Sequence, residues 1–318
     1  MSERTTLVTG ASGFLGAHVV AAAVERNRRS GTFADPLGRL VVATGRDVVL
    51  APRYTTPRDA AQWLAAELPE GLAALLERAQ PCEVVHCAAL SRTADCERDP
   101  ARAERLNTAL PGALAAWCAA HGARLVHVST DLVFGAVDAP PGGFREDDPP
   151  APVSVYGATK LAGERAVLAA HPGAVVARLP LLYGDSAGRG LGASDALLAA
   201  VERDEVPGLF VDEFRTPLEV SHAARALVEL LDHGVRGVVH VAGPERTSRH
   251  HFGLAVLRAM GLSDADAAAA VRPITQTSID TGAPRPRDVS LDARRAARHL
   301  ATPLPDIQRG LAAALGPG

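Results

Sequence analysis

The stretch TTLVTGASGFLG, residues 5–16, places three glycines directly behind a short β-branched run. The run predicts a strand, and the apolar pattern from Phe14 onward predicts the helix that follows it. In such a unit Gly10 would make the tight turn, Gly13 would admit a phosphate close to the backbone, and Gly16 would let the helix pack against the strand. Free N–H groups at the start of that helix favour an anion. The stretch therefore predicts nucleotide binding at the first turn.

Strand-like and helical runs alternate through much of the chain. Short β-branched runs separated by helical patterns are typical of parallel strands joined by right-handed crossovers. We therefore expect an α/β fold with a doubly wound parallel sheet of the Rossmann type and a smaller C-terminal lobe. The further elements predicted are a helix near 101–120 and strands at 39–46, 82–90, 123–130, 173–184 and 237–243.

The sequence after about residue 183 is more broken and carries clusters of glycine and proline. This change suggests a second lobe built from separate segments. We expect residues 1–182 plus 213–242 to form the dinucleotide-binding domain, and residues 183–212 plus 243–318 to form a lobe that binds the substrate. The segment 47–66 fits the alternation poorly and is expected to be a connection with a short helix or strand.

The composition argues against several classes of function. The chain has 318 residues, a net charge of −3 and 4% aromatic residues, so neither a basic field nor a base-stacking platform indicates nucleic-acid binding. No apolar run approaches the ~20 residues that span a membrane, and a strand that begins by residue 5 leaves no room for a signal peptide. We expect a cytoplasmic protein without a metal site. The cysteines are Cys82, Cys87, Cys96 and Cys118, and we expect them to be reduced because they form no C-x-x-C pair.

The stretch SVYGATK, residues 154–160, sets a tyrosine and a lysine four positions apart at the predicted start of a helix. Four positions is about one helical turn, so Tyr156 and Lys160 would project from one face. An ammonium close to a phenol favours the phenolate and lowers its pKa from about 10. The pair is either an acid with its tuning charge, or a capping aromatic beside a solvated lysine.

The G-x-x-G-x-x-G spacing of the first turn resembles the short-chain dehydrogenase/reductase superfamily, in its extended, sugar-nucleotide branch. Four further stretches stand where that branch has the turn beneath the nicotinamide ribose, a helical asparagine, the catalytic hydroxyl and the Tyr–Lys pair. They are HCAAL (86–90), RLNTALPGALAAW (105–117), VHVSTDLVF (126–134) and FREDDPPAPVSVYGATKLAGERAV (144–167).

Within that branch, the chain is similar to the dTDP-4-dehydrorhamnose reductases and to the regulatory β subunit of methionine adenosyltransferase. The resemblance extends into the second lobe and covers nearly the whole chain. It is carried there by RLPLLYG (178–184), FRTPLEVSHAARALVELL (214–231) and RPIT…APRPRDVSLD (272–292).

The resemblance implies a catalytic triad of Thr130, Tyr156 and Lys160. Tyr156 would pass a proton to a carbonyl oxygen, Thr130 would hold that oxygen, and Lys160 would also hold the nicotinamide ribose. Ser129 lies beside Thr130, but the S-[ST]-D pattern of the family uses the second hydroxyl, and alternation along the strand turns the two in opposite directions.

The resemblance also implies the contacts of the cofactor and the substrate. Besides the Tyr–Lys pair, the cofactor would contact Gly10, Ser12, Gly13, Phe14, Leu15, Gly16, Arg46, Cys87, Ala88, Ala89, Asn107 and Leu179. The substrate would contact Leu90, Ser91, Asp131, Leu132, Arg215 and Arg285. Arginine suits an anionic substrate group because its planar fork is always charged. The family often has tyrosine at the position of Leu132, so the identity of the substrate stays open.

The end of the second predicted strand bears on the choice of cofactor. An acid at this position favours NAD, whereas an arginine favours NADP. The strand RLVVATGR ends in Arg46, and Asp47 comes one step later. We expect Arg46 to bind the 2′-phosphate of NADPH or NADP, with NADH also possible. The Asp-Leu pair that the family places near the adenine corresponds to Glu67 and Leu68.

These observations predict an NADPH-dependent reductase of a nucleotide-linked keto-sugar, in particular a 4-keto-6-deoxyhexose. The protein could form a homodimer. An epimerase of the same fold is one alternative. A dehydratase is disfavoured because an Asp-Glu pair usually follows the hydroxyl, and here Thr130 is followed by Asp131 and Leu132. A different class is a non-catalytic, NADP-binding regulatory subunit, which the triad does not discriminate because the adenosyltransferase subunit keeps a similar Tyr–Lys spacing.

Overall fold

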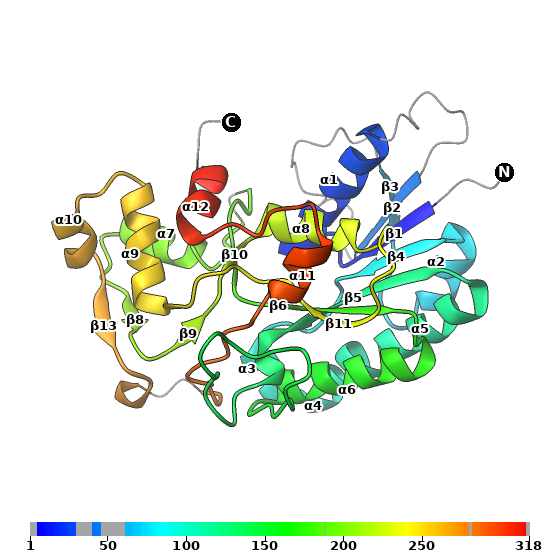
Figure 1. The fold of residues 1–318 in the computed structure, drawn as a ribbon, viewed down its shortest axis with the longest axis horizontal. Helices are drawn as coiled ribbons and strands as arrows, with labels where there is room; N and C mark the ends of the chain where they lie inside the picture. Colours follow the sequence, from blue (N-terminus) through cyan, green and yellow to red (C-terminus); the bar gives the residue numbers. More distant parts are fainter. Residues whose placement is uncertain (1–4, 30–39, 46–60, 188, 280–281, 316–318) are drawn as a thin grey trace.

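A parallel sheet of seven strands runs through the centre of the molecule (Figure 1). The computed structural model describes residues 5–29, 40–45, 61–187, 189–279 and 282–315. The strands lie in the order β11 (Gly237–His240), β6 (Val175–Leu179), β5 (Arg124–Thr130), β4 (Glu83–His86), β1 (Thr5–Thr9), β2 (Leu40–Gly45) and β3 (Gln62–Ala65). Neighbouring strands in this sheet are parallel. The chain winds from β1 to β3 and then in the opposite direction from β4, so the predicted doubly wound fold is confirmed.

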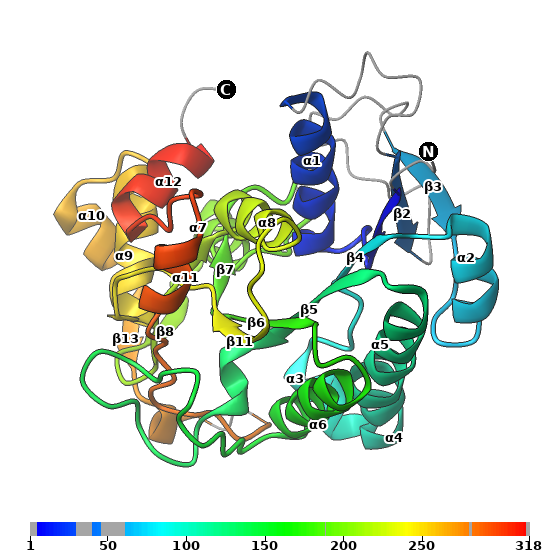
Figure 2. The same ribbon diagram turned by 45° about the vertical axis from the view of Figure 1, so that its right-hand side comes forward.

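Helices cover both faces of the sheet, as Figure 2 shows. Side chains alternate along each strand, so Leu7 and Val8 belong to different buried clusters on opposite faces. The cluster of Val8 includes side chains of α1 (Phe14–Arg29), α8 (Val220–Glu229) and α11 (Arg294–His299). The cluster of Leu7 includes side chains of α2 (Leu72–Ala79), α5 (Leu110–His121) and α6 (Val155–Ala170). Before α5 come α3 (Thr93–Arg98), α4 (Pro100–Glu104) and a π-helical turn, Arg105–Ala109.

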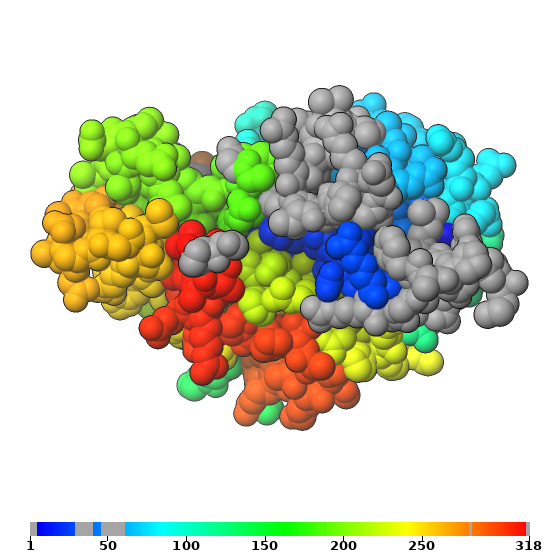
Figure 3. All heavy atoms as spheres, turned by 90° about the horizontal axis from the view of Figure 1, so that it is seen from above, coloured from blue at the N-terminus to red at the C-terminus, as the bar shows by residue number. Residues whose placement is uncertain are grey.

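The second lobe lies beside the sheet and has its own core around Tyr183, Phe252 and Val256. Its elements are α7 (Asp195–Glu202), β8 (Gly208–Phe210), α9 (Arg249–Ala259), α10 (Asp264–Ala269), β13 (Arg272–Ile274) and α12 (Ile307–Leu315). Seen from above in Figure 3, α12 (red) lies between this lobe and the pair α1 and α8. Within the described residues, three short ladders complete the fold: β8 with β13, β7 (Leu182–Tyr183) with β10 (Leu218–Glu219), and β9 (Phe214–Arg215) with β12 (Thr247–Ser248).

Several boundaries differ from the predicted ones. The strand expected at 82–90 ends at His86, and the strand expected at 173–184 is divided into β6 and β7 around Pro180, which has no N–H to donate to a ladder. The end of the segment 47–66 forms β3. Ala296 and Leu300, which the expected division gives to the second lobe, pack in the cluster beneath α1 and α8. The division into two domains stays a prediction.

In the described part of the chain, no helix combines the length and the apolar character needed to cross a membrane. The four cysteines are free thiols, of which Cys96 and Cys118 are buried. Within the same described ranges, no group of three or more His, Cys, Asp or Glu side chains could hold a metal ion.

Candidate active site

A cavity of about 920 Å³ opens at the carboxyl ends of β1, β4, β5 and β6. It lies where the strand order reverses between β1 and β4, which is the usual position of a ligand in an open α/β sheet. The residues singled out from the sequence that line it are Gly10, Ser12, Gly13, Phe14, Leu15, Gly16, Glu67, Leu68, Cys87, Ala88, Ala89, Leu90, Ser91, Thr130, Tyr156, Lys160 and Leu179.

Close backbone approach shapes the first turn. Gly10 has φ of +66°, and a Cβ on it would lie 2.7 Å from the backbone nitrogen of Ala88. Gly13 is exposed to the cavity, and among the described residues other than its chain neighbours, the atom within 4 Å of a Cβ built on it is the Gly10 carbonyl oxygen, at 3.1 Å. The space beside Gly13 is therefore open, at the N-terminal end of α1. A glycine-lined recess at a helix N-terminus fits the pyrophosphate of a dinucleotide.

Asn107 holds the turn that follows β4. Its side-chain amide accepts a hydrogen bond from the Leu90 N–H at 2.9 Å and donates one to the Leu90 carbonyl oxygen at 3.0 Å. Asn107 is only 1% exposed and is not one of the residues that line the cavity. The structure thus gives this residue, predicted to contact the cofactor, a contact with the backbone that carries Ala88 and Ala89.

The first turn of α6 brings Tyr156 close to the end of β5. The Ser154 hydroxyl caps this helix by accepting a hydrogen bond from the Gly157 N–H at 3.1 Å. A Cβ on Gly157 would lie 2.1 Å from the Leu132 carbonyl oxygen, so glycine is needed for this close approach. As a result Tyr156 and Thr130 both line the cavity, and Thr130 is close enough to act on the pKa of the Tyr156 hydroxyl.

The pKa of Tyr156 is raised, not lowered as the sequence predicted. Burial is the main cause, the hydrogen bond from Thr130 opposes it, and the nearby Asp131 adds to it. Lys160 does not lower this pKa because its ammonium group points elsewhere. It donates a hydrogen bond to the Val128 carbonyl oxygen at 2.6 Å. Tyr156 is therefore protonated at neutral pH, which suits a proton donor.

Lys160 is a buried cation with a histidine pair beside it. Burial lowers the pKa of Lys160 to about 8, against the opposing effect of Glu164. The Lys160 ammonium lies 3.5 Å from Nε2 of His127, and the His127 ring stacks on His86 with centroids 5.3 Å apart. Burial lowers the pKa of both histidines, so both are neutral and His127 can accept a hydrogen bond from Lys160.

Ser129 and Thr130 have different partners. The Ser129 hydroxyl donates to the carboxylate of Glu164, which forms a buried ion pair with Arg178 at 2.7 Å. The Thr130 hydroxyl instead donates to Asp131 at 3.0 Å and accepts from the Leu132 N–H at 3.2 Å. Thr130 is the one of the two that acts on the pKa of Tyr156, which supports the second hydroxyl of the pair, and its catalytic role stays a prediction.

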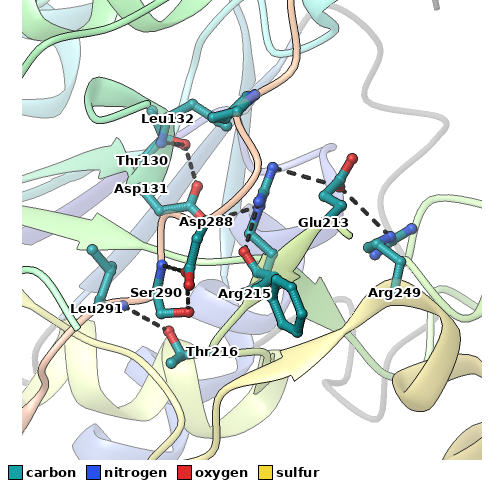
Figure 4. Close-up of polar contacts among 12 residues, drawn as sticks. Thr130, Asp131, Leu132, Glu213, Arg215, Thr216, Arg249, Asp288, Ser290 and Leu291 are labelled. Carbon is teal, nitrogen blue, oxygen red and sulfur yellow. Dashed lines mark hydrogen bonds and ion pairs between the residues drawn. The ribbon is translucent and has the colours of Figure 1, made fainter. Parts of the chain in front are cut away.

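A buried group of charges lies behind Thr130, between the sheet and the second lobe (Figure 4). The guanidinium of Arg215 lies between two carboxylates, with Nε 3.5 Å from Asp131 and Nη2 3.5 Å from Glu213. Glu213 also pairs with Arg285 at 2.8 Å and with Arg249 at 3.9 Å. We call these five side chains the arginine cluster. Its two carboxylates and Arg215 are all at least nine-tenths buried.

A family model described as "RmlD substrate binding domain" matches residues 4–317. The chain belongs to this family. A relative named dTDP-4-dehydrorhamnose reductase from Mycolicibacterium smegmatis is 38% identical over 238 residues, which cover 73% of this chain and 71% of the relative. Methionine adenosyltransferase 2 subunit beta from Pongo abelii is 36% identical over 222 residues, covering 68% of this chain and 64% of that protein.

The fold of this RmlD-family chain also matches solved structures. A dTDP-4-dehydrorhamnose reductase from Bacillus anthracis, crystallised in complex with NADP, has a TM-score of 0.76 at 20% identity, covering 99% of each chain. The resemblance stated from the sequence, to the reductases and to the adenosyltransferase subunit, is therefore confirmed.

Some predicted site residues do not lie on the cavity wall. Asp131, Leu132, Arg215 and Arg285 are behind it, in or next to the arginine cluster. Arg46, the predicted 2′-phosphate ligand, lies outside the described residues.

Sequence reasoning missed several residues that the structure places at the site. Glu67 and Leu68, which the sequence suggested for the adenine, line the cavity, but the rest of the segment 64–71 was missed, as were Arg78, Arg102 and Arg105. Glu213 and Arg249 complete the arginine cluster. The acid two positions before Arg215, in VDEFRTP, was the available signal for Glu213.

Proposed function

We propose that this RmlD-family chain is an NADPH-dependent reductase of a nucleotide-linked keto-sugar, in particular a 4-keto-6-deoxyhexose. The observation that carries the proposal is that Thr130, Tyr156 and Lys160 line the same cavity as the glycine turn. The name of the mycolicibacterial relative supports the substrate class. We also propose a cytoplasmic location, with which the free thiols are compatible, and a homodimer.

The cavity has the features that a dinucleotide needs. Gly10, Gly13 and the start of α1 would hold the pyrophosphate, and Ala88 with Lys160 would hold the nicotinamide ribose. The Lys160 ammonium now donates to the Val128 carbonyl oxygen at 2.6 Å, and it would donate to a ribose hydroxyl when the cofactor binds. When bound, reduced nicotinamide supplies a hydride for a carbonyl carbon.

The chain itself handles the proton. The Tyr156 hydroxyl is protonated at neutral pH and donates its proton to the carbonyl oxygen as negative charge develops there. Thr130 positions that oxygen with a hydrogen bond. On the substrate side, Arg285 is 39% exposed, but it lies behind the cavity wall and is paired with Glu213 at 2.8 Å, so an anionic group such as a diphosphate would have to compete with that ion pair.

A second candidate is the non-catalytic regulatory subunit, favoured by the 36% identity with the adenosyltransferase β subunit. In this case the cavity would bind the dinucleotide without turnover, and the Tyr156 hydroxyl would have no chemical task.

Single-turnover oxidation of NADPH tests the proposal. Wild type and Tyr156→Phe are mixed with a 4-keto-6-deoxy sugar nucleotide, and the absorbance of NADPH is followed with enzyme in excess. Because Tyr156→Phe removes only the hydroxyl, the rate should fall by about 10²–10⁴-fold while NADPH affinity barely changes.

Equal rates in the two proteins would remove Tyr156 from the mechanism. No oxidation by wild type across dTDP-, UDP- and GDP-linked keto-sugars, with NADPH still bound, would favour the regulatory subunit. Co-purification with a synthetase partner at fixed stoichiometry would then be expected.

A further inference from the structure

The hydroxyl of Thr130 has one proton and more than one neighbour that can take it. Its oxygen accepts a hydrogen bond from the Leu132 N–H at 3.2 Å, so that side of the oxygen is occupied. Its proton points to Oδ1 of Asp131 at 3.0 Å. The Tyr156 hydroxyl is a second neighbour, on which Thr130 acts by lowering its pKa. While Asp131 is ionised it is the stronger acceptor, and the Thr130 proton is drawn away from the cavity.

Asp131 belongs to the arginine cluster, whose members shift its pKa in opposite directions. Asp131 is 4% exposed, and its Oδ2 is buried without a hydrogen bond. Arg215 lies 3.5 Å from it and favours the ionised form, whereas Glu213, 3.5 Å further along the same guanidinium, disfavours it. Tyr156 on α6 faces Asp131 from the cavity side.

Glu213 limits how firmly Arg215 can hold Asp131. The carboxylate of Glu213 is 3% exposed and attracts three guanidinium groups, those of Arg215, Arg249 and Arg285. Arg215 is anchored a second time because its Nη1 donates to the Phe214 carbonyl oxygen at 2.7 Å. Figure 4 shows the guanidinium held between the two acids. Arg215 is not among the residues that line the cavity. Consistent with this division, burial raises the pKa of Asp131 to about 6 in spite of Arg215.

We propose that Arg215 and Glu213 are positioning residues that act through Asp131, and that the charge on Asp131 decides whether the Thr130 hydroxyl donates inward to Asp131 or outward to the substrate oxygen. The inference rests on the proposed reductase function for its kinetic consequence, but its structural part does not.

Two effects of the same sign connect this charge to reduction. An ionised Asp131 accepts the hydrogen bond of the Thr130 hydroxyl. It also disfavours the negative charge that develops on the Tyr156 oxygen when Tyr156 gives up its proton. A neutral Asp131 cannot act as a charged acceptor, so Thr130 is free to donate to the carbonyl oxygen. The proton on Asp131 comes from solvent and stays on the carboxyl group during the reaction. Reduction should therefore be faster on the acid side of the Asp131 titration.

Two substitutions in the cluster should move this titration in opposite directions. Glu213→Gln removes a negative charge that disfavours ionisation of Asp131, so the inflection should move to lower pH. Arg215→Gln removes the positive charge that favours ionisation, so the inflection should move to higher pH. Each shift should be about one pH unit.

Two further variants act as controls. Asp131→Asn keeps the shape without the charge and should make the profile flat through this range. Arg246→Gln removes an ion pair of the same lobe, with Asp288 at 2.7 Å, and should leave the inflection where it is.

The experiment measures the hydride step and the carboxyl group separately. The first measurement is the single-turnover rate of NADPH oxidation after a pH jump, from pH 5 to 8, with saturating 4-keto-6-deoxy sugar nucleotide. The second is the ¹³C NMR titration of aspartate-labelled protein without substrate, in which the signal missing from Asp131→Asn identifies Asp131. Circular dichroism at each pH confirms that the variants are folded.

The expected result is an inflection near pH 6 in both measurements, with opposite shifts in Glu213→Gln and Arg215→Gln. Shifts of the same sign, or unshifted inflections with uniformly lower rates, would overturn the proposal and leave the cluster a structural role. If no keto-sugar is reduced, the proposed function fails, while the carboxyl titration still decides whether Arg215 and Glu213 control Asp131.

Discussion

The glycine turn and the arginine cluster, at the two ends of the site, owe their shape to different kinds of contact. At the glycine turn, the backbone determines the shape of the cavity, because Gly10 and Gly13 have no side chain to fill it. In the arginine cluster, buried charges from distant parts of the chain hold one another in place. The first end tolerates little added volume and the second tolerates little change of charge. Each end should therefore fail in its own way when it is altered.

The largest effect is expected at the backbone end. Gly13→Val places a branched side chain in the open space beside the turn, so binding of NADPH and NADH should both become undetectable, a loss of at least about a hundredfold. Fluorescence titration with each cofactor measures this, and Gly13→Ala should give a smaller loss. Thermal unfolding should change little, because within the described part of the chain the close non-adjacent neighbour of the new Cβ is the Gly10 carbonyl oxygen at 3.1 Å. Unchanged cofactor binding in folded Gly13→Val would show that the pyrophosphate binds elsewhere.

The next effect separates two adjacent hydroxyls. Thr130→Val should lower the single-turnover rate by about 10²–10³-fold, because a hydrogen bond to the developing oxyanion is lost. Ser129→Ala is the matched control, since its hydroxyl donates to Glu164 and not to Tyr156. It should leave the rate within about threefold and lower the free energy of unfolding by about 1–3 kcal/mol. The opposite pattern, with Ser129 essential for the rate, would exchange their roles.

Lys160 should make stability depend on pH. The pKa of Lys160 is about 8 in the folded protein and 10.5 as the ordinary value, so between these values the unfolded chain binds the extra proton. Stability from this group therefore rises with pH through that window, by up to about 3 kcal/mol. Urea unfolding at pH 7.5 and 10, without cofactor, should show the rise in wild type and not in Lys160→Met. An identical pH dependence in both proteins would mean that Lys160 is not a desolvated cation.

The smallest expected effect concerns the cofactor's 2′-phosphate. If Arg46 binds this group, Arg46→Ala should weaken NADPH binding by one to two decades, the equivalent of about 1.5–3 kcal/mol. NADH has no such phosphate, so its affinity should stay the same. Calorimetric titration of both cofactors measures the difference. An equal loss for NADH and NADPH would assign another residue to the phosphate, and Arg78, Arg102 and Arg105 on the cavity wall would be examined next.

The sequence predicted the features that depend on local spacing. The glycine turn, the order of strands and helices, and the Tyr156–Lys160 pair are each encoded within a few residues. The direction of the Lys160 side chain was missed, because the competing acceptor, the Val128 carbonyl oxygen, lies on a strand more than 30 positions away. The raised pKa of Tyr156 was missed for the same reason, since burial depends on the packed structure.

The arginine cluster could be predicted only in part. Arg215 and Arg285 were singled out as arginines that suit an anionic substrate, but their common partner Glu213 and the link to Asp131 are contacts between segments more than 70 positions apart. Alternation along β5 did predict that Ser129 and Thr130 point to opposite sides, because a strand fixes the side to which each side chain points, whereas the preference for Thr130 came from the family pattern.

The π-helical turn at Arg105–Ala109 makes the chain unusual in how it should respond to a deletion. A π turn contains one residue more than regular α-helical winding, so losing one residue here would restore a continuous α-helix instead of breaking it. The same deletion would turn the side chain at the position of Asn107 by about 100° and take it away from the Leu90 backbone. Such a variant should keep its helical circular dichroism and lose cofactor affinity. The helix would therefore stay continuous without the extra residue, but the turn after β4 would lose its hydrogen bonds to Asn107.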